Sequence, residues 1–145
     1  MKKILLFFIA TIGMIACGSE EVLENEVLNG NWRLNTIVNL ENNQSRFPKN
    51  SSGEEEESDL YQIHFISPSS FKGKTMANTF EGVYSKNNNS INFEINRISE
   101  VLDPSESDSY FFQNSIENTS SYEISNNQLK LFTSDHCLVF NVIQL

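Results

Sequence analysis

Residues 71–84 decide the fold, and they read Phe71-Lys72-Gly73-Lys74-Thr75-Met76-Ala77-Asn78-Thr79-Phe80-Glu81-Gly82-Val83-Tyr84. Phe80, Gly82 and Tyr84 recur at every second position, which is the spacing of residues on one face of a β-strand. Asn78 suits a tight bend just before this strand, because its side chain can hydrogen-bond nearby backbone. Gly82, between two aromatic rings, allows a close approach of another backbone or a bend in the sheet. Two interpretations stay open: these residues are purely structural, or Asn78, Phe80 and Tyr84 line one wall of a pocket.

The same alternation recurs along the rest of the chain. Apolar residues alternate with polar ones in five further segments: Trp32 and Leu34; Tyr61, Ile63 and Phe65; Ile91, Phe93 and Ile95; Leu129 and Leu131; Leu138, Phe140 and Val142. Turn signals separate these segments, notably at 67–70, 87–89 and 126–127. Short strands with hairpin-length gaps predict a mostly β fold, with a single antiparallel sheet that is curled or forms a small, partly open barrel.

One segment is helical in pattern. Asp103 is a good N-cap, Pro104 suits the first helical position, and Glu106 stands where a capping box needs it. The residues that then fall close to one helical face are Tyr110, Phe112 and Ile116, with Phe111 beside them. The sequence therefore predicts one α-helix of about three turns packed on the sheet, its aromatic stripe belonging to the core.

Residues 41–59 break the alternation. They contain Pro48, Gly53 and the acidic run Glu54-Glu55-Glu56-Glu57, whose carboxylates repel one another. We expect a mobile, disordered acidic loop within the domain. A calcium site needs spaced oxygen ligands and a turn-forming glycine inside the loop, and this run lacks both, so no metal site is predicted.

The N-terminus has the features of a bacterial lipoprotein signal. Lys2 and Lys3 precede an apolar run, Ile4–Ile15, that would span roughly 18 Å as a helix, too short for a bilayer core of about 30 Å. The run ends in Ala16-Cys17, which resembles a lipobox. We expect a signal peptide at 1–16, lipidation of Cys17, an acidic tether at 17–27 and one domain at 28–145.

The residues behind the anchor favour one location. Several acyl chains on Cys17 would hold the protein stably at a membrane. Gly18 differs from the aspartate that resembles an inner-membrane retention signal, and Glu20-Glu21 resembles surface-export signals. These features predict an outer-membrane lipoprotein, on the periplasmic face or at the cell surface.

Charge excludes one class of partner. The 145 residues carry a net charge of -9, and removal of Lys2 and Lys3 with the leader makes it about -11. Nucleic-acid binding needs a basic stripe for the phosphates, so we expect no nucleic-acid partner.

No catalytic constellation emerges from the sequence. His64 and His136 lie far apart in the chain, and neighbours such as Asp135, His136 and Cys137 point apart on a strand or turn. Ligand spacing for a metal and a phosphate-cradling glycine loop are both missing. We expect neither an enzyme nor a cofactor, and Cys137 reads as a small buried hydrophobe.

Several motifs together resemble the META domain, the HslJ-like family. The opening Leu28-Asn29-Gly30-Asn31-Trp32-Arg33-Leu34 looks like the family's Leu-x-Gly-x-Trp-x-Leu start. Residues 78–84 look like its Asn-x-Phe-x-Gly-x-Tyr core, with Ala77 where the family often has cysteine. The helix and the closing strands follow in the family's order, so the resemblance covers residues 28–145. A Gly-x-Trp start is also shared by lipocalin-like domains.

The resemblance implies an envelope protein with a possible stress-related role and no established biochemical activity. Two hypotheses follow. The first is a structural or protein-interaction module that presents a sheet face or groove to an envelope partner. The second is a lipocalin-like carrier of a small apolar ligand in the mouth of the barrel. A hollow interior lined by Phe80, Tyr84 and Phe93 would favour the carrier, and a filled interior would favour the interaction module.

Overall fold

The computed structural model describes residues 28–143, in which one antiparallel sheet of nine strands surrounds one helix. The elements are β1 (Gly30–Asn39), β2 (Ser45–Arg46), β3 (Gln62–Ser67), β4 (Ser70–Lys74), β5 (Thr79–Asn87), β6 (Ser90–Ile98), α1 (Ser109–Glu117), β7 (Ser121–Ser125), β8 (Gln128–Phe132) and β9 (His136–Val142). The predicted mostly β fold, a curled antiparallel sheet with one helix, is confirmed.

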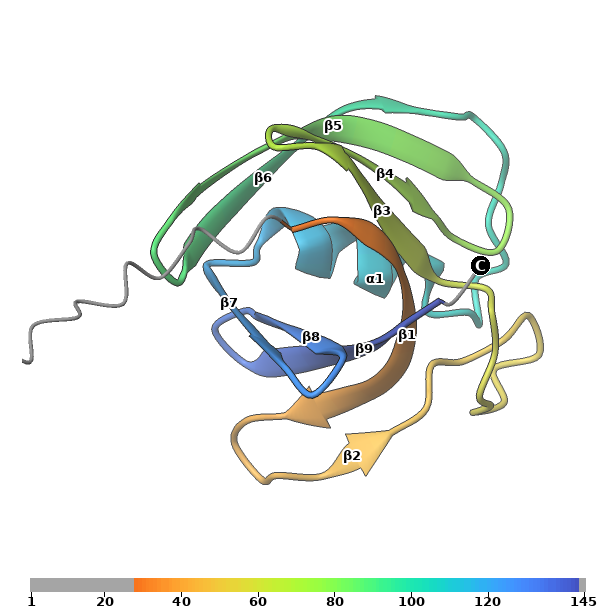
Figure 1. Cartoon of the computed structure of the whole chain (residues 1–145). Helices are drawn as coiled ribbons and strands as arrows, with labels where there is room; N and C mark the ends of the chain where they lie inside the picture. Colours follow the sequence, from red (N-terminus) through yellow and green to blue (C-terminus); the bar gives the residue numbers. More distant parts are fainter. Residues whose placement is uncertain (1–27, 144–145) are drawn as a thin grey trace, which may run out of the picture.

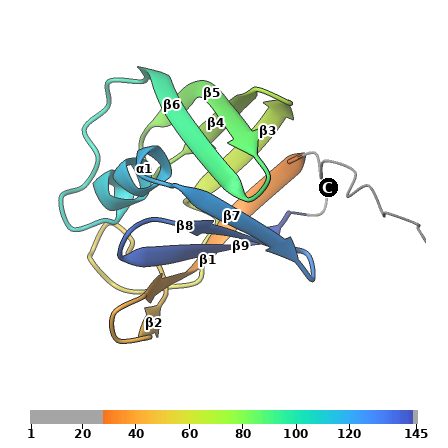
Figure 2. The same cartoon turned by 90° about the vertical axis from the view of Figure 1, so that its left-hand side faces the viewer.

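The sheet closes into an irregular ring. Neighbouring strands run from β3 to β9 in chain order, and β1 pairs with both β3 and β9, while β2 extends the sheet beyond β1. Between β6 and β7 the pairing is reduced to Ser90 opposite Ser121, so the ring is not a regular barrel. Figure 1 shows the strands framing α1, and Figure 2 shows α1 lying toward one end of the ring.

Asparagines form the tight turns. Asn88, Asn126 and Asn127 have φ values of 53°, 50° and 61°, in the left-handed region that asparagine tolerates better than other residues with a side chain. They lie in the β5–β6 and β7–β8 hairpins, where the sequence predicts turns. These short turns hold consecutive strands in register.

Aromatic rings fill the interior of the ring. Phe65 lies 5.1 Å from Tyr84 and 6.2 Å from Phe93, measured between ring centroids, and Phe71 lies 5.0 Å from Phe93. A second set of contacts continues across the interior and joins Phe71 to Phe80, Phe80 to Phe112, and Phe112 to Tyr61 and Phe140, all at 5.4–6.2 Å. Rings in mutual contact at these distances leave no space for a ligand between them.

The predicted alternation holds at the other strands too. Trp32, Leu34, Ile63, Leu129 and Leu138 are buried, as the pattern requires, and Val142, at 36% exposed, is the exception at the end of β9. A buried face on every long strand explains why the sheet curls around a common core.

The helix begins later than the sequence predicts. It starts at Ser109 with Asp108 in the N-cap position, so Asp103 and Pro104 lie in the segment before it and the predicted capping box does not form. Phe112 and Ile116 are fully buried, as predicted, but Tyr110 is 80% exposed. The physical reason is that the carboxylate of Asp103 is engaged elsewhere, by Ala77 and Asn78.

Segment 41–59 follows a defined path. It contains β2, a turn in which Asn50 accepts hydrogen bonds from the backbone of Ser52 and Glu54, and a bridge between Lys49 and Glu55. The burial of Pro48 and the ion pair between Arg46 and Asp108 were not predicted from the sequence. The mobility of this segment stays a prediction.

The predicted signal peptide at 1–16, lipidated Cys17 and tether at 17–27 lie outside the described residues. Within 28–143, no helix is long and apolar enough to cross a bilayer.

Candidate functional site: a polar groove beside the helix

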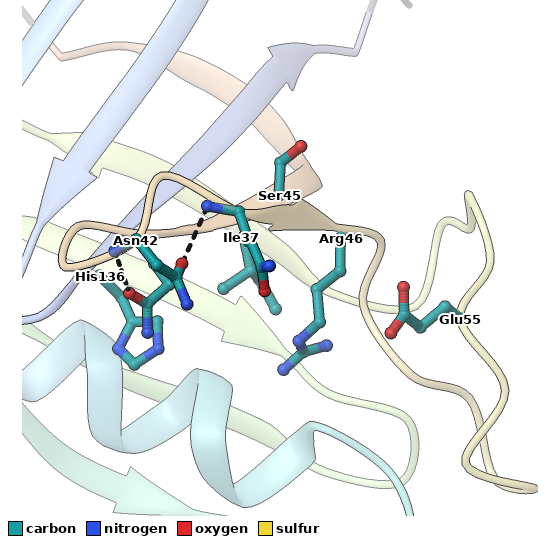
Figure 3. Close-up of a pocket in the computed structure, with 8 residues that line it drawn as sticks. Ile37, Asn42, Ser45, Arg46, Glu55 and His136 are labelled. Atoms are coloured by element: carbon teal, nitrogen blue, oxygen red, sulfur yellow. Dashed lines mark hydrogen bonds between the residues drawn. The ribbon is translucent and has the colours of Figure 1, made fainter.

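A groove with a volume of about 480 Å³ lies at the end of the ring near α1, where the β1–β2 hairpin, the start of β9 and Glu55 line it. Asn39 and His136 face it from the same side of β1 and β9 as the buried Ile37 and Leu138. Its lining residues are Ile37, Asn39, Asn42, Gln44, Ser45, Arg46, Glu55 and His136. Figure 3 shows Arg46 projecting toward α1, with His136 on one side and Glu55 on the other. This volume is within the range of small-molecule sites in proteins.

Side-chain amides build the hairpin end of the groove. Asn39 Oδ1 accepts hydrogen bonds from the backbone N–H groups of Glu41 and Asn42, at 2.9 and 3.1 Å. Asn42 Oδ1 in turn accepts one from the backbone of Gln44, at 2.9 Å. Asn43 takes a φ of 57°, which completes the turn. The oxygens of these asparagines thus hold the turn, and their NH₂ groups remain available to the groove.

Arg46 ties the hairpin to the start of the helix. Its guanidinium bonds both carboxylate oxygens of Asp108, at 2.5 and 3.0 Å, and Asp108 also accepts a 2.6 Å bond from the backbone of Lys49. The hydrogen bond to Asp108 raises the pKa of Arg46, against the opposing effect of burial. Because Asp108 is only 6% exposed, this pair fixes the distance between β2 and α1.

Phe111 of α1 contacts two side chains of the groove, Arg46 and His136. The guanidinium carbon of Arg46 lies 5.6 Å from the centre of its ring, and the ring of His136 meets it edge to face at 5.1 Å. The position of Arg46 is that of a cation–π contact. The partly buried Phe111 therefore orients Arg46 and His136 toward the same space.

Segment 41–59 supplies the far wall, with Glu55. Lys49 pairs with Glu55 in a β-bridge, and the buried Tyr61 donates a 2.6 Å hydrogen bond to the carbonyl oxygen of Lys49. Burial raises the pKa of Tyr61, so its hydroxyl remains a donor at neutral pH. The acidic segment is thereby attached to the core at the point where it borders the groove.

The residues predicted from the 71–84 motif lie elsewhere. Tyr84 is buried and donates to the carbonyl oxygen of Ser67 at 3.0 Å, and Trp32 is buried with its Nε1 donating to Asn29 at 3.2 Å. Phe80 packs on Phe112 in the core. Gly82 lies where a Cβ atom would be 2.0 Å from the carbonyl oxygen of Glu94. Each of these contacts is structural, and none of the five predicted residues lines the groove described above.

Asn78 forms a polar network rather than a pocket wall. Its Nδ2 donates to Asp103 at 2.7 Å and to the carbonyl of Val101 at 2.6 Å, while its Oδ1 accepts from Ser99 at 2.9 Å. Burial acts to raise the pKa of Asp103, but hydrogen bonds from Asn78 and the backbone of Ala77 outweigh it, and the pKa is lowered. The network holds the segment after β6 against the β4–β5 turn.

The triplet Asp135-His136-Cys137 does not form a reactive site. His136 Nδ1 lies 3.1 Å from Asp135, and its ring shares the inner face of β9 with Leu138, whereas Cys137 lies on the opposite face and is only 4% exposed. Burial raises the pKa of the Cys137 thiol to about 11, so it is protonated at neutral pH. Within the described residues, no cluster of three or more His, Cys, Asp or Glu side chains is gathered to hold a metal ion.

A second, smaller groove lies at β4, β5 and β6, and the predicted pocket residue Phe80 is among the residues that line it. Its charged residues pair with one another: Glu81 lies 3.9 Å from Lys72 and 3.0 Å from Arg97. These exposed pairs neutralise the surface locally and leave a smaller hollow of about 340 Å³. The groove beside α1 is the stronger candidate, because it is larger and its polar groups are less engaged.

Sequence reasoning missed this groove almost entirely. Two of its lining residues were considered from the sequence and set aside, His136 as a catalytic candidate and Glu55 as a calcium ligand. The sequence gives no functional signal at Asn39, Asn42, Gln44 or Ser45. One signal was available: Arg46 is a cation inside an acidic segment, a position that indicates a buried acidic partner.

The fold and the groove define a small, mostly β protein built on one curled antiparallel sheet, with aromatic rings packed in its interior and the candidate site at the end of the ring near α1. The family model described as "Domain of unknown function (DUF4847)" matches residues 23–142, and the chain belongs to this family. No curated protein matches the chain.

Solved structures support the fold. A DUF4847 family protein from Bacteroides vulgatus is similar with a TM-score of 0.56 and 16% identity, over 84% of this chain and 98% of that one. A protein from Burkholderia xenovorans has a TM-score of 0.58 at 11% identity, over 82% and 85% of the two chains. A lipocalin-like protein from Bacteroides uniformis has a TM-score of 0.51 at 19% identity, over 80% and 98%. At these identities the likeness establishes the fold alone.

The resemblance to META domains is wrong, because the matching family is DUF4847. The motif residues have local reasons to be present in any tightly curled sheet. Gly82 makes room for the backbone of Glu94, and Trp32 fills the ring where β1 joins β3 and β9. Similar residue types therefore arise without common family membership. The stress-related role rested on that resemblance and has no other support.

Proposed function

We propose that this chain is a non-enzymatic binding module of the cell envelope, and that it binds through the groove beside α1 rather than through the interior of the ring. The observation that carries the proposal is the contrast between the two regions. The interior is occupied by aromatic rings in contact, whereas the groove presents polar side chains to solvent.

The burial of Cys137, the candidate nucleophile, supports a non-enzymatic role. Catalysis by a cysteine needs an exposed thiolate next to a base. Burial raises the pKa of the Cys137 thiol, and His136 lies on the opposite face of β9, toward the groove.

The envelope location rests on the N-terminal sequence. The apolar run ending in Ala16-Cys17 favours lipidation, and the residues that follow favour the outer membrane. Labelling cells with a palmitate analogue tests this: the label should enter the wild-type chain and be lost in Cys17→Ser. Labelling that persists in Cys17→Ser would refute the anchor.

The alternative function is that of a carrier for a small apolar ligand. It draws on one structural neighbour that is described as lipocalin-like. In this chain a ligand inside the ring would have to displace Phe112, which is fully buried among Tyr61, Phe80 and Phe140. The groove beside α1 needs no such rearrangement, and we therefore place it first.

Native mass spectrometry of the full chain, purified from envelopes of its own host, tests the proposal. Ser45→Trp fills the groove from β2, and Ser85→Trp is a matched control, since both serines are exposed on strands and Ser85 lies on the outer face of β5. We expect a bound mass on the wild type and on Ser85→Trp, and its loss from Ser45→Trp.

Two results would overturn the proposal. Retention of the bound mass by Ser45→Trp would place the ligand elsewhere. Its loss from Phe112→Leu, a mild change in the core, together with retention by Ser45→Trp, would favour the interior carrier.

A further inference from the structure

We propose that the ligand of this groove is a neutral, polyhydroxylated molecule, that is, a saccharide. The inference rests on the proposed function, since it names the chemical class that the same groove would take. It follows from the hydrogen-bonding groups, the charge and the size of the site.

The groove offers both hydrogen-bond donors and hydrogen-bond acceptors. Among the described residues, the Nδ2 groups of Asn39 and Asn42 and the whole side-chain amide of Gln44 have no hydrogen-bond partner. The hydroxyl of Ser45 and the carboxylate of Glu55 likewise make no hydrogen bond within that part of the chain, although Glu55 attracts the charge of Arg46. Each sugar hydroxyl donates one hydrogen bond and accepts others, so it matches a surface on which amide donors alternate with carbonyl and carboxylate acceptors.

The charges of the groove disfavour an anion. Arg46 is the side chain that would attract one, but Asp108 already bonds it through both oxygens, at 2.5 and 3.0 Å. Glu55 faces the same space with the acidic run 54–57 around it, and Asp135 lies against His136. A phosphate or carboxylate would meet a net negative environment and is repelled.

A cation is disfavoured for the converse reason. Glu55 would attract an amine, but the guanidinium of Arg46 lies in the same groove and remains charged, with a raised pKa. Three of its five N–H donors bond Asp108 and the carbonyl of Phe47, which leaves two for a ligand. Arginine with unengaged N–H groups, next to amides and a carboxylate, is suited to hydroxyl oxygens of a neutral ligand.

Size and rigidity agree with a small saccharide. A volume of about 480 Å³ holds a small molecule rather than a folded partner. The hydrogen bonds of the turn hold the amides of Asn39 and Asn42 in place before any ligand arrives, and Asp108 and Phe111 hold the guanidinium of Arg46. Preorganised groups lower the ordering cost of binding.

Saturation-transfer NMR on the full chain, in a detergent without a sugar head group, tests the inference. The probes are maltose, cellobiose, lactose and diacetylchitobiose, with inorganic phosphate, citrate and putrescine as charged comparisons, all at millimolar concentration. We expect transfer to at least one disaccharide and to none of the charged probes. Gln44→Ala should weaken that binding about fivefold to tenfold, the worth of about one hydrogen bond, and Ser45→Trp should abolish it.

The control is Ser85→Trp, which should bind the disaccharide as the wild type does. Binding of phosphate, citrate or putrescine without any disaccharide, or disaccharide binding that survives Ser45→Trp, would overturn the inference. The two proposals fail separately: if Ser45→Trp removes a host-derived bound mass but no disaccharide binds, the saccharide class is wrong and the groove remains the binding site.

Discussion

Gly73 and Gly82, on neighbouring strands β4 and β5, have no room for a Cβ atom. A Cβ on Gly73 would lie 2.0 Å from the ring of Phe80, and one on Gly82 would lie 2.0 Å from the carbonyl oxygen of Glu94. The β5–β6 register shifts beside Gly82, between Glu81 and Gly82, so the backbones approach closely where the sheet bends. These glycines let two neighbouring strands curl over the aromatic core.

Gly82→Ala should therefore destabilise the fold by about 1–3 kcal/mol, since the clash is with backbone that must shift. Urea denaturation followed by fluorescence measures the free energy of unfolding. Ser85→Ala, on the same strand but exposed, should change it by no more than about 0.5 kcal/mol. Equal effects of the two substitutions would show that the close approach is not what Gly82 provides.

Asp103 makes the free energy of unfolding depend on pH in the acid range. Its folded-state pKa is lowered by hydrogen bonds, including those from Asn78 and Ala77, despite burial acting to raise it. A group with a lowered folded pKa contributes stability that is present above its ordinary value near 3.8 and is lost as pH falls through the folded value.

We expect Asp103→Asn to cost about 1–3 kcal/mol at neutral pH, because acceptors for two donors are lost or weakened. The difference from the wild type should shrink as pH falls below about 4. Denaturant curves at a series of pH values check both points. A difference that is constant down to the acid limit would mean that Asp103 is not ionised in this network.

The sequence predicts Asn78 as a bend residue, but Asp103, its hydrogen-bond partner, was predicted to be a helix N-cap. Asp103 looks like a helix N-cap in isolation, because N-caps and loop carboxylates share the same local chemistry. Its actual use depends on Ala77 and Asn78 approaching from 25 or more residues away, which no local pattern reveals.

At the scale of elements, α1 packs against the sheet through one buried face. Phe112 is fully buried and contacts the rings of Phe80 on β5, Phe140 on β9 and Tyr61 just before β3, while its neighbour Tyr110 is 80% exposed. Asp108 gives no side-chain hydrogen bond to the helix end, and α1 lacks acidic residues in its first turn and basic residues in its last. Packing rather than capping therefore holds this nine-residue helix in place.

Phe112→Ala should lower the free energy of unfolding by about 3–5 kcal/mol, the cost of a cavity at a core phenylalanine. Tyr110→Ala, two residues away, should leave it within about 0.5 kcal/mol. Thermal unfolding followed by circular dichroism compares the two. A small loss for Phe112→Ala would indicate that α1 is loosely attached and would strengthen the interior-carrier hypothesis.

The second link between elements is the Arg46–Asp108 pair. Arg46→Met leaves the carboxylate of Asp108 buried without its cation, which should cost about 2–4 kcal/mol, less than for a fully buried pair because Arg46 is partly exposed. The double variant with Asp108→Leu should be less destabilised than the sum of the single variants. A double-mutant cycle in urea measures this coupling, and additivity within about 0.3 kcal/mol would rule out a direct contribution of the pair.

Strands and helices could be predicted where apolar residues recur at a regular spacing in the sequence. Alternation located the long strands, since each buries one face against a common core. The two-residue strand β2 has no period to count, and it reads as a loop because only its neighbour β1 and the distant Asp108 define it. The start of α1 was predicted too early because Asp103, the expected N-cap, bonds Ala77 and Asn78 instead.

At the scale of the whole molecule, ring closure creates the candidate site. β1 pairs with β9 at residues 32–39, which brings His136 beside Asn39 and next to the β1–β2 hairpin. Nothing in a single sequence indicates this long-range pairing, and so the groove could not be predicted even though each of its residues was visible. Family membership was misassigned for a related reason: motif residues that a curled sheet needs for packing do not distinguish one family from another.

The most direct test of binding in the groove beside α1 is hydrogen–deuterium exchange of the full chain, with and without the species that copurifies from its host envelope. We predict slower exchange in residues 37–46 and around His136 when the species is bound, with little change in β4, β5 and β6. Slower exchange in β4–β6 together with faster exchange in α1 would contradict the account, since that pattern means a ligand inside the ring with the helix displaced.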